Sequence, residues 1–186
     1  DLGINRLATL SDGSVFENQK PLRSLLGKVK RLNRNLSRKQ KGSKNREKAR
    51  LKLARLHYRI ACIREDDLHK VTTWIADTYG LVGLESLHVK GMMKNHALAQ
   101  ALGDAAFGTF SRFLATKVRA RGGKVQAVGR FYPSSKTCSN CRQRRDTLSL
   151  NERVYRCPTC GVEMDRDLNA AINILNEAVR LSALHV

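Results

Sequence analysis

Four cysteines near the carboxyl end of the chain constrain its fold more than any other feature. They form two Cys-x-x-Cys pairs, Cys138 with Cys141 and Cys157 with Cys160, separated by the short segment 142–156. Two such pairs can place four thiolates around one metal ion at tetrahedral positions, which is the arrangement of a structural zinc site. The spacing therefore predicts a small ribbon held by one structural Zn²⁺ ion.

Two disulfides are the alternative interpretation of the same cysteines, and the rest of the sequence disfavours it. The printed sequence shows no signal-peptide pattern and no apolar stretch long enough to cross a bilayer, and a fifth cysteine, Cys62, would be left unpaired. A protein of the reducing cytoplasm that does not contact a membrane fits these features better.

The charge of the chain is strongly positive and concentrated in one segment. The formal net charge is +19 for 186 residues, and Glu47 is the only acid between residues 20 and 64. That segment carries the following basic residues: Lys20, Arg23, Lys28, Lys30, Arg31, Arg34, Arg38, Lys39, Lys41, Lys44, Arg46, Lys48, Arg50, Lys52, Arg55, Arg59 and Arg64. Such a balance indicates a polyanionic partner, and nucleic acid is the first candidate.

The same segment has the periodicity of two amphipathic helices. Apolar residues recur at helical spacing from Leu22 to Leu36, the pattern breaks at 39–43, and a second stripe runs from Ala49 to Tyr79 before Gly80. We therefore expect a basic helical hairpin over residues 20–79. The alternative to nucleic-acid binding is an ordinary charged helix face in contact with solvent. Such faces normally carry both acidic and basic residues, and this one is almost entirely basic. The residues expected to bind nucleic acid are Arg31, Arg34, Arg38, Lys39, Lys41, Lys44, Arg46 and Lys48, with Lys136 near the first cysteine pair.

Strands and helices alternate through the remainder. The opening DLGINRLATLSDGSVF predicts a hairpin turning at Asp12-Gly13, and LVGLESLHV and KVQAVGRF predict buried strands. Between them, the stretch from Met92 to Gly122-Gly123 predicts one helix, and DRDLNAAINIL begins the final one. This order predicts an α/β fold.

Four carboxylates fall where separate elements end or begin. Asp1 stands at the expected end of a strand, Glu85 lies within a strand, and Asp165 and Asp167 stand at a helix start. Acids from separate elements could together hold divalent cations, which prefer oxygen ligands. Taken singly, each has an ordinary alternative: Glu85 can turn to solvent at a strand end, and an aspartate at a helix start is most often an N-cap.

Several motifs, in this order, resemble those of one known family. DLGI, GLESLHVKGM, FYPSSKTCSNC, CPTCG and DRDLNAAINIL resemble the TnpB proteins of insertion-sequence transposons, the OrfB zinc-ribbon family related to type V CRISPR effectors. The likeness extends over essentially the whole chain. It implies a Mg-dependent, RNA-guided DNA endonuclease with an RNase H-like (RuvC-type) domain, one structural zinc ion and two catalytic Mg²⁺ or Mn²⁺ ions. A prokaryotic, cytoplasmic and nucleoid-associated protein that binds guide RNA and target DNA is then expected.

The resemblance also assigns residues and domains. By position, Asp1, Glu85 and Asp167 resemble the catalytic metal-binding acids, Asp165 is a supporting or capping residue, and Cys138, Cys141, Cys157 and Cys160 bind zinc. The implied domains are a RuvC-like domain over 1–135, a zinc ribbon over 136–163, and the last helix of the nuclease domain over 164–186.

The chain departs from the family pattern at two places. Arg142 follows the first cysteine pair where the family usually has glycine, which costs conformational energy if that turn needs a positive φ. The first catalytic aspartate is residue 1, whereas in the family a strand and a recognition region precede it, so an N-terminally truncated nuclease domain is expected. The alternative function is therefore a truncated, inactive nucleic-acid-binding protein. A ribosome-associated zinc ribbon would leave Glu85 and DRDLNAA unexplained.

Overall fold

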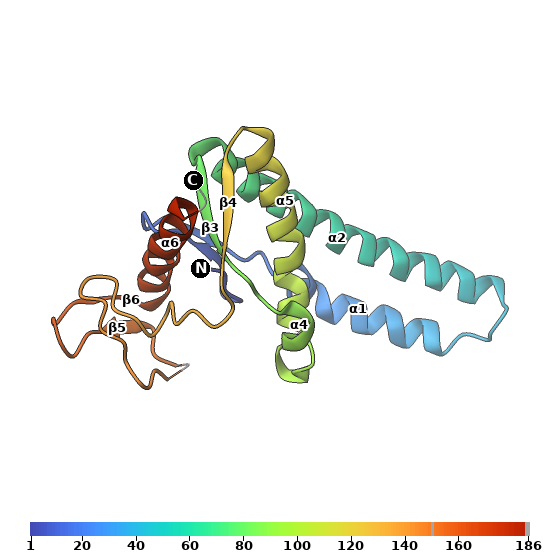
Figure 1. The fold of residues 1–186 in the computed structure, drawn as a ribbon. Helices are drawn as coiled ribbons and strands as arrows, with labels where there is room; N and C mark the ends of the chain where they lie inside the picture. Colours follow the sequence, from blue (N-terminus) through green and yellow to red (C-terminus); the bar gives the residue numbers. More distant parts are fainter. Residues whose placement is uncertain (150, 185–186) are drawn as a thin grey trace.

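The computed structural model describes residues 1–149 and 151–184. A body of mixed helices and strands carries a long helical hairpin that projects away from it, and a small cysteine-containing module lies on the opposite side of the body (Figure 1). The described part contains no helix that is both long enough and apolar enough to span a bilayer.

The chain begins with an antiparallel hairpin, as predicted. Strand β1 (Arg6–Thr9) pairs with β2 (Val15–Glu17). The turn between them is closed at Asp12, whose carboxylate accepts hydrogen bonds from the backbone and hydroxyl of Ser14, and Gly13 supplies the left-handed conformation with φ 91°. A bridge between Leu2 and Ala8 extends the pairing to the first residues.

The two strands predicted to be buried form a parallel pair, but among their residues only Val128 is buried. Strand β3 (Leu81–Glu85) lies beside β4 (Lys124–Val128), with Glu85 opposite Val128 at the carboxyl ends of both. Helix α5 packs on this pair from one side and α6 from the other (Figure 1). Gly83 permits the close approach of α6, because a Cβ atom there would lie 2.8 Å from the Cβ of Ala178.

The crossover between β3 and β4 corrects one prediction. Instead of one helix there are three: α3 (Val89–Met92), α4 (His96–Ala105) and α5 (Phe107–Ala120). Asn95 caps α4, and Ala106 adopts a left-handed conformation with φ 48° that separates α4 from α5. The break lets Phe107 pack with Leu102 in one cluster while the rest of α5 enters the main core. Tertiary packing thus overrides the continuous helical pattern.

The basic hairpin has the predicted form. Helix α1 (Pro21–Ser37) begins with proline, and Ser43 caps α2 (Lys44–Thr78) by accepting a 3.2 Å hydrogen bond from the backbone of Arg46. The two helices pack through Val29, Leu56 and Ile60. Further along, α2 enters the body, where Leu68, Val71 and Ile75 join Phe110 and Leu114 of α5 in the main core.

The cysteine segment and the final helix complete the chain. Strand β5 (Val154–Arg156) pairs antiparallel with β6 (Glu163–Asp165), and α6 (Arg166–Ala183) follows directly. The expected ribbon at 136–163 includes residue 150, and the expected last segment at 164–186 includes residues 185–186. These three positions lie outside the described residues.

Candidate metal centre

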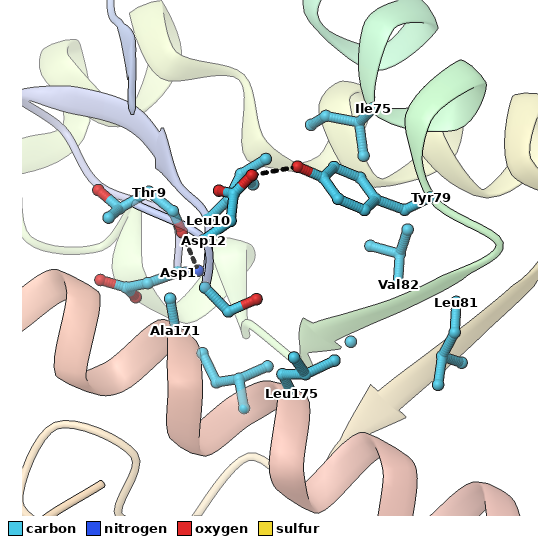
Figure 2. Close-up of a pocket in the computed structure, with 13 residues that line it drawn as sticks. Asp1, Thr9, Leu10, Asp12, Ile75, Tyr79, Leu81, Val82, Ala171 and Leu175 are labelled. Atoms are coloured by element: carbon cyan, nitrogen blue, oxygen red, sulfur yellow. Dashed lines mark hydrogen bonds between the residues drawn. The ribbon is translucent and has the colours of Figure 1, made fainter. Parts of the chain in front are cut away.

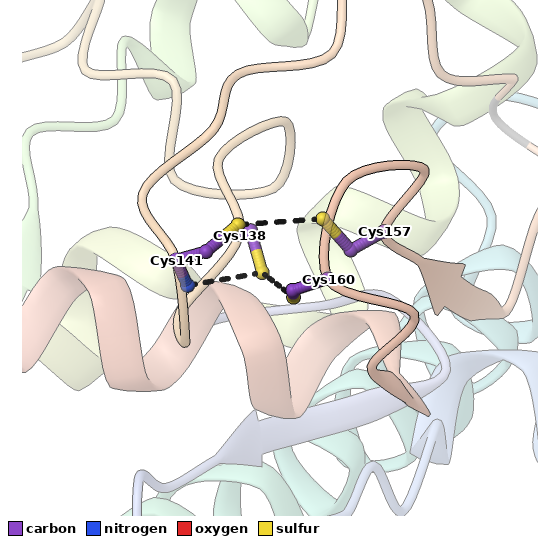
Figure 3. A group of neighbouring side chains, drawn as sticks. All are labelled: Cys138, Cys141, Cys157 and Cys160. Carbon is purple, nitrogen blue, oxygen red and sulfur yellow. Dashed lines mark hydrogen bonds between the residues drawn. The ribbon is translucent and has the colours of Figure 1, made fainter.

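The four cysteines come together as predicted. Their sulfur atoms all lie within 4.8 Å of one another, and two loops bring the pairs face to face (Figure 3). Sγ–Sγ distances are 3.6 Å for Cys138 and Cys160 and 3.5 Å for Cys141 and Cys157. A tetrahedron with Zn–S bonds of about 2.3 Å has an edge of about 3.8 Å, so these positions fit a zinc ion. They are too far apart for disulfides, whose S–S bond is about 2.05 Å.

Backbone donors in the second knuckle favour the thiolate form that a metal requires. The backbone N–H of Val162 and the Asn140 amide lower the pKa of the Cys160 thiol to about 6. The backbone N–H groups of Cys160 and Thr159 likewise lower the pKa of Cys157. Four sulfur ligands in a tetrahedron form a donor set suited to zinc.

The turn after the first cysteine pair has a positive φ at Arg142, a conformation that is costly for a residue with a Cβ atom. Arg142 has φ 66°, and Gly161 occupies the matching place after the second pair with φ 73°. Both knuckles thus use a left-handed residue, but only the second has glycine there. The Arg142 guanidinium reaches Asn173 of α6 at 3.5 Å.

Three acids singled out from the sequence line one cavity of about 490 Å³. Asp1 pairs with Thr9 of β1, Glu85 ends β3, and Asp167 lies in the first turn of α6. Burial lowers the pKa of the Asp1 α-amino group to about 6, although the negative charges of Glu85 and Asp167 both oppose this shift. Both carboxylates are therefore within Coulombic reach of Asp1.

The acids share this cavity without closing on a single point. Within residues 1–149 and 151–184, only the cysteine cluster has all its ligand atoms within 4.8 Å of one another. Arg6, Arg153 and Arg166 line the same cavity, so positive side chains surround the carboxylates. The cavity thus combines oxygen ligands for a hard cation with guanidinium groups that can face an anion.

Glu85 is neither turned to solvent nor left without a partner. It is half-buried, and its Oε1 accepts a 2.6 Å hydrogen bond from the hydroxyl of Ser134, a buried residue of the SSKTC motif. The hydroxyl fixes one carboxylate oxygen of Glu85 and leaves the other for a further ligand.

The two aspartates of the DRD motif have different surroundings. Asp165 is the N-cap of α6: its Oδ1 accepts from the backbone of Asp167 at 2.9 Å and of Leu168 at 3.2 Å, and its Oδ2 accepts from Arg6 at 2.7 Å. Burial opposes ionisation of Asp165, but these donors outweigh it and lower the pKa of the carboxyl. Asp167 instead lines the acidic cavity, with one oxygen 3.3 Å from Arg166. Of the two aspartates, Asp167 is the one that lines the acidic cavity.

Asp1 also lines a second cavity. It has a volume of about 340 Å³ and is bounded by the end of β1, the last turn of α2, the start of β3 and α6 (Figure 2). Its walls are mainly apolar, and the hydroxyl of Tyr79 donates a hydrogen bond to Asp12 at its edge. Neither Glu85 nor Asp167 lines it. The acidic cavity is therefore the better candidate for metal chemistry.

Most of the basic residues expected to bind nucleic acid are exposed on the hairpin. Arg31 and Arg34 project from α1, Arg38 directly follows the last residue of that helix, and Lys39, Lys41, Lys44 and Lys48 surround the turn into α2. Two of the expected residues have internal contacts. Arg46 donates to the backbone oxygens of Leu36 and Lys39 and closes the turn. Lys136 donates to the backbone oxygen of Asp146 within the cysteine module.

Sequence reasoning did not identify several residues of this region. Ser134 and Arg153 line the acidic cavity, and Asn169 and Asn173, both fully buried, fasten the cysteine module to α6. The motif NAAIN offered a signal for the asparagines. Amides spaced four residues apart on an apolar helix face need hydrogen-bond partners when they are buried.

Together, the fold and the site define an α/β protein in which a four-cysteine ribbon stands beside an acidic cavity. The chain belongs to the OrfB_IS605 family, described as "Probable transposase", which it matches over residues 1–96. Residues 107–174 match the Cas12f1-like TNB domain. These matches confirm the resemblance to TnpB proteins and type V effectors inferred from the motifs.

Similar proteins have related names and greater length. A Streptomyces pristinaespiralis protein named "Putative RNA-guided DNA endonuclease" is 42% identical over 98% of this chain and 45% of its own length. An Escherichia coli protein named "Putative RNA-guided DNA endonuclease InsQ" is 38% identical over 94% of this chain and 47% of its own. The chain therefore spans less than half the length of these relatives.

Solved structures share the fold at low sequence identity. A chain of the Cas12f1-sgRNA-target DNA complex matches 94% of this chain and 48% of its own length, with a TM-score of 0.65 and 17% identity. A chain of a CRISPR-Cas12f ternary complex gives a TM-score of 0.64 at 20% identity, over 94% of this chain and 37% of its own.

Proposed function

We propose that this chain is the catalytic part of an RNA-guided DNA endonuclease that hydrolyses phosphodiester bonds with the help of divalent cations. Its fold is then of the RNase H-like (RuvC) type. Residues 1–135 and 164–186 form the nuclease domain, and residues 136–163 form an inserted zinc ribbon. The family membership and the names of the relatives support the general activity.

One observation carries the proposal. Asp1, Glu85 and Asp167 come from three elements far apart in the sequence, yet they line one cavity. Taken singly, each had an ordinary structural explanation, and a shared cavity is not expected from three unrelated surface acids. The structure also supplies a different role for Asp165, as a helix cap bound to Arg6. We therefore assign the metal-binding role to Asp1, Glu85 and Asp167.

The residues fit the cations that this activity needs. Mg²⁺ and Mn²⁺ prefer carboxylate oxygens, and two such ions activate a water and stabilise the leaving oxygen of a phosphodiester. The three carboxylates would hold the ions, and Ser134 orients Glu85 through its hydroxyl. The guanidinium groups of Arg6, Arg153 and Arg166 give the cavity positive charge that can face a phosphate. At the ribbon, the four cysteines would hold one Zn²⁺ ion that maintains the fold of the loops.

We propose guide RNA and target DNA as the partners. The exposed arginines and lysines of α1 and of the α1–α2 turn form a basic surface without interleaved acids, which suits the phosphate backbone of either nucleic acid. Base pairing with the guide would then select the sequence, while the protein contacts backbone.

The proposal is tested by titrating Mn²⁺ into the zinc-loaded chain by calorimetry, because cation binding requires no guide. We expect saturable binding that is lost in Glu85→Ala, since one of three carboxylate ligands is removed. Glu65→Ala is the matched control, because it removes an exposed acid of α2 that does not line the cavity, and it should bind like the wild type.

Two outcomes would contradict the proposal. If Glu85→Ala binds Mn²⁺ as tightly as the control, the cations are held elsewhere. If the folded wild-type chain binds no Mn²⁺, the acids do not form a cation site in this chain, and the alternative of an inactive nucleic-acid-binding protein is favoured.

A further inference from the structure

We propose that Ser134 is a positioning residue that fixes the Glu85 carboxylate and joins it, through Asn169 and Asn173, to the four-cysteine ribbon. Binding of metal by the cysteines and binding of divalent cations by the acidic cavity would then be coupled. The inference rests on the proposed function, because it concerns the same three carboxylates.

The series of contacts that joins Glu85 to the cysteines begins at the Ser134 hydroxyl. Ser134 is 6% exposed, and its hydroxyl lies 2.6 Å from Oε1 of Glu85. In the described part of the chain, the Ser134 hydroxyl is the group that donates a hydrogen bond to the Glu85 carboxylate. Glu85 ends β3, so its backbone is fixed by pairing with Val128. With the backbone fixed, the serine hydroxyl determines where the carboxylate points.

The second step is the attachment of Ser134 to α6. The backbone oxygen of Ser134 accepts a 2.8 Å hydrogen bond from the Asn173 amide. The same amide reaches the backbone oxygen of Thr137 at 2.6 Å, and Asn169 reaches that oxygen at 2.7 Å. Both asparagines are fully buried, where a lost hydrogen bond is costly. The turn from Ser134 to Thr137 is therefore held against α6 at both ends.

The third step leads into the cysteine cluster. Asn169 also accepts a 2.9 Å hydrogen bond from the backbone of Ser139, so its amide holds the residues on either side of Cys138. Cys138 is fully buried, and its sulfur lies 3.6 Å from that of Cys160. The position of the first cysteine and the position of Ser134 are thus set by the same two side chains of α6.

The geometry gives a physical reason for coupling. Helix α6 carries Asp167 in its first turn and the two asparagines in the turns that follow. A metal ion bound by the four cysteines would stabilise the contacts of Thr137 and Ser139 with α6, and through them the contact of the Ser134 hydroxyl with Glu85. Groups that orient metal ligands without touching the ion typically change metal affinity by about 10- to 100-fold when they are removed.

The test measures Mn²⁺ affinity by calorimetry for the zinc-loaded wild type and three variants. Ser134→Ala removes the hydroxyl and should weaken Mn²⁺ binding by about tenfold. Ser134→Thr keeps a hydroxyl and should restore affinity to within about twofold of the wild type. Ser135→Ala is the matched control, because Ser135 lines the same cavity but does not bind Glu85 in the described part of the chain, and its affinity should be unchanged.

A second measurement tests the connection to the cysteines. Co²⁺ is titrated into the metal-free, reduced chain, with and without saturating Mn²⁺, and its thiolate absorption reports binding at the cysteine cluster. Coupling between two binding sites is reciprocal, so Mn²⁺ should tighten Co²⁺ binding by about fivefold in the wild type. In Ser134→Ala that effect of Mn²⁺ should disappear, while the absorption band itself shows that the ribbon still folds.

Three results would overturn the inference. Equal Mn²⁺ affinity in Ser134→Ala and the wild type would show that the hydroxyl does not position Glu85, while the proposed function would stand. Weak binding in Ser134→Thr, equal to that of Ser134→Ala, would point to packing rather than to the hydroxyl. No Mn²⁺ binding in the wild type would remove the proposed function together with the inference.

Discussion

At the scale of single residues, Arg142 shows how the chain tolerates local strain next to its cysteine cluster. A left-handed conformation costs a residue with a Cβ atom roughly 1–2 kcal/mol, and Arg142 adopts it with φ 66°. Gly161 adopts nearly the same conformation with φ 73° after the second cysteine pair, where no Cβ is present. The matched knuckles therefore offer an internal comparison.

We expect Arg142→Gly to be more stable than Arg142→Ala by about 1 kcal/mol, since both lose the guanidinium but only glycine relieves the strain. Comparison with alanine removes the contribution of the 3.5 Å contact between Arg142 and Asn173. Gly161→Ala should lose a similar amount relative to the wild type. Urea unfolding of the zinc-loaded proteins measures these differences, and equal stability of the two Arg142 variants would contradict the prediction.

At the scale of elements, the attachment of the basic hairpin depends on a residue of a distant helix. Asp104 of α4 is 3% exposed, and its two carboxylate oxygens accept from the backbone of Leu22 and Arg23, both at 2.9 Å. It therefore caps the first turn of α1 from outside that helix. Arg64 of α2 forms an ion pair with the same carboxylate at 3.2 Å, so Asp104 joins both helices of the hairpin to the body.

Removing this carboxylate should destabilise the chain strongly. We expect Asp104→Ala to lose about 3 kcal/mol of unfolding free energy, because it leaves two backbone donors and a partly buried guanidinium without their partner. Asp66→Ala is the control: its pair with Lys70 is exposed and should contribute less than about 1 kcal/mol. Urea denaturation compares the two, and a similar small loss in both variants would show that Asp104 does not anchor the hairpin.

The same elements show what the sequence could and could not predict. Apolar patterns located the N-terminal hairpin and both helices of the basic hairpin, because each pattern reflects one buried face. The strand that ends at Glu85 was predicted instead from its density of Leu and Val, although all five of its residues are only partly buried. The break at Ala106 had no local signal: alanine favours helix, and the left-handed turn is imposed by packing on either side of it. Likewise, Asp104 caps residues more than eighty positions away, a contact that no local pattern encodes.

For the candidate site too, the sequence predicted some residues and not others. The spacing of the cysteines was sufficient to predict their cluster, because two short knuckles determine the ligand positions. The acids required the whole set of family motifs, since Glu85, Asp165 and Asp167 each fit an ordinary role alone. The contacts of Ser134 with Glu85 and of Asn169 with the first knuckle join distant segments, so they became visible only in three dimensions.

At the scale of the whole molecule, most of the excess positive charge lies on the helical hairpin, and the carboxylates of the candidate site lie elsewhere. The hairpin that projects from the body (Figure 1) carries most of the excess basic residues. The acidic cavity is lined by residues of β3 and α6 in the body. An extended basic surface can therefore hold nucleic acid by its phosphates at a distance from the carboxylates. Its contribution should depend strongly on salt, because bound phosphates release their counterions.

Neutralising one face of α1 tests this arrangement. Arg31, Arg34 and Arg38 are exposed and lie at helical spacing, so replacing all three with glutamine should weaken binding of single-stranded RNA. The slope of log K against log salt should become shallower by about 2, since each lost contact to a single strand contributes about 0.7. Filter binding or fluorescence anisotropy at several salt concentrations measures both quantities.

The control removes the same charge from the body. Arg119, Lys124 and Arg130 are exposed on α5, β4 and the segment after it, and their replacement by glutamine lowers the net charge equally. If the hairpin is the contact surface, this control keeps the wild-type salt slope and loses only the weak attraction due to net charge. Equal slopes in both triple variants would instead mean that RNA is held by diffuse charge, and that α1 is not a specific contact surface.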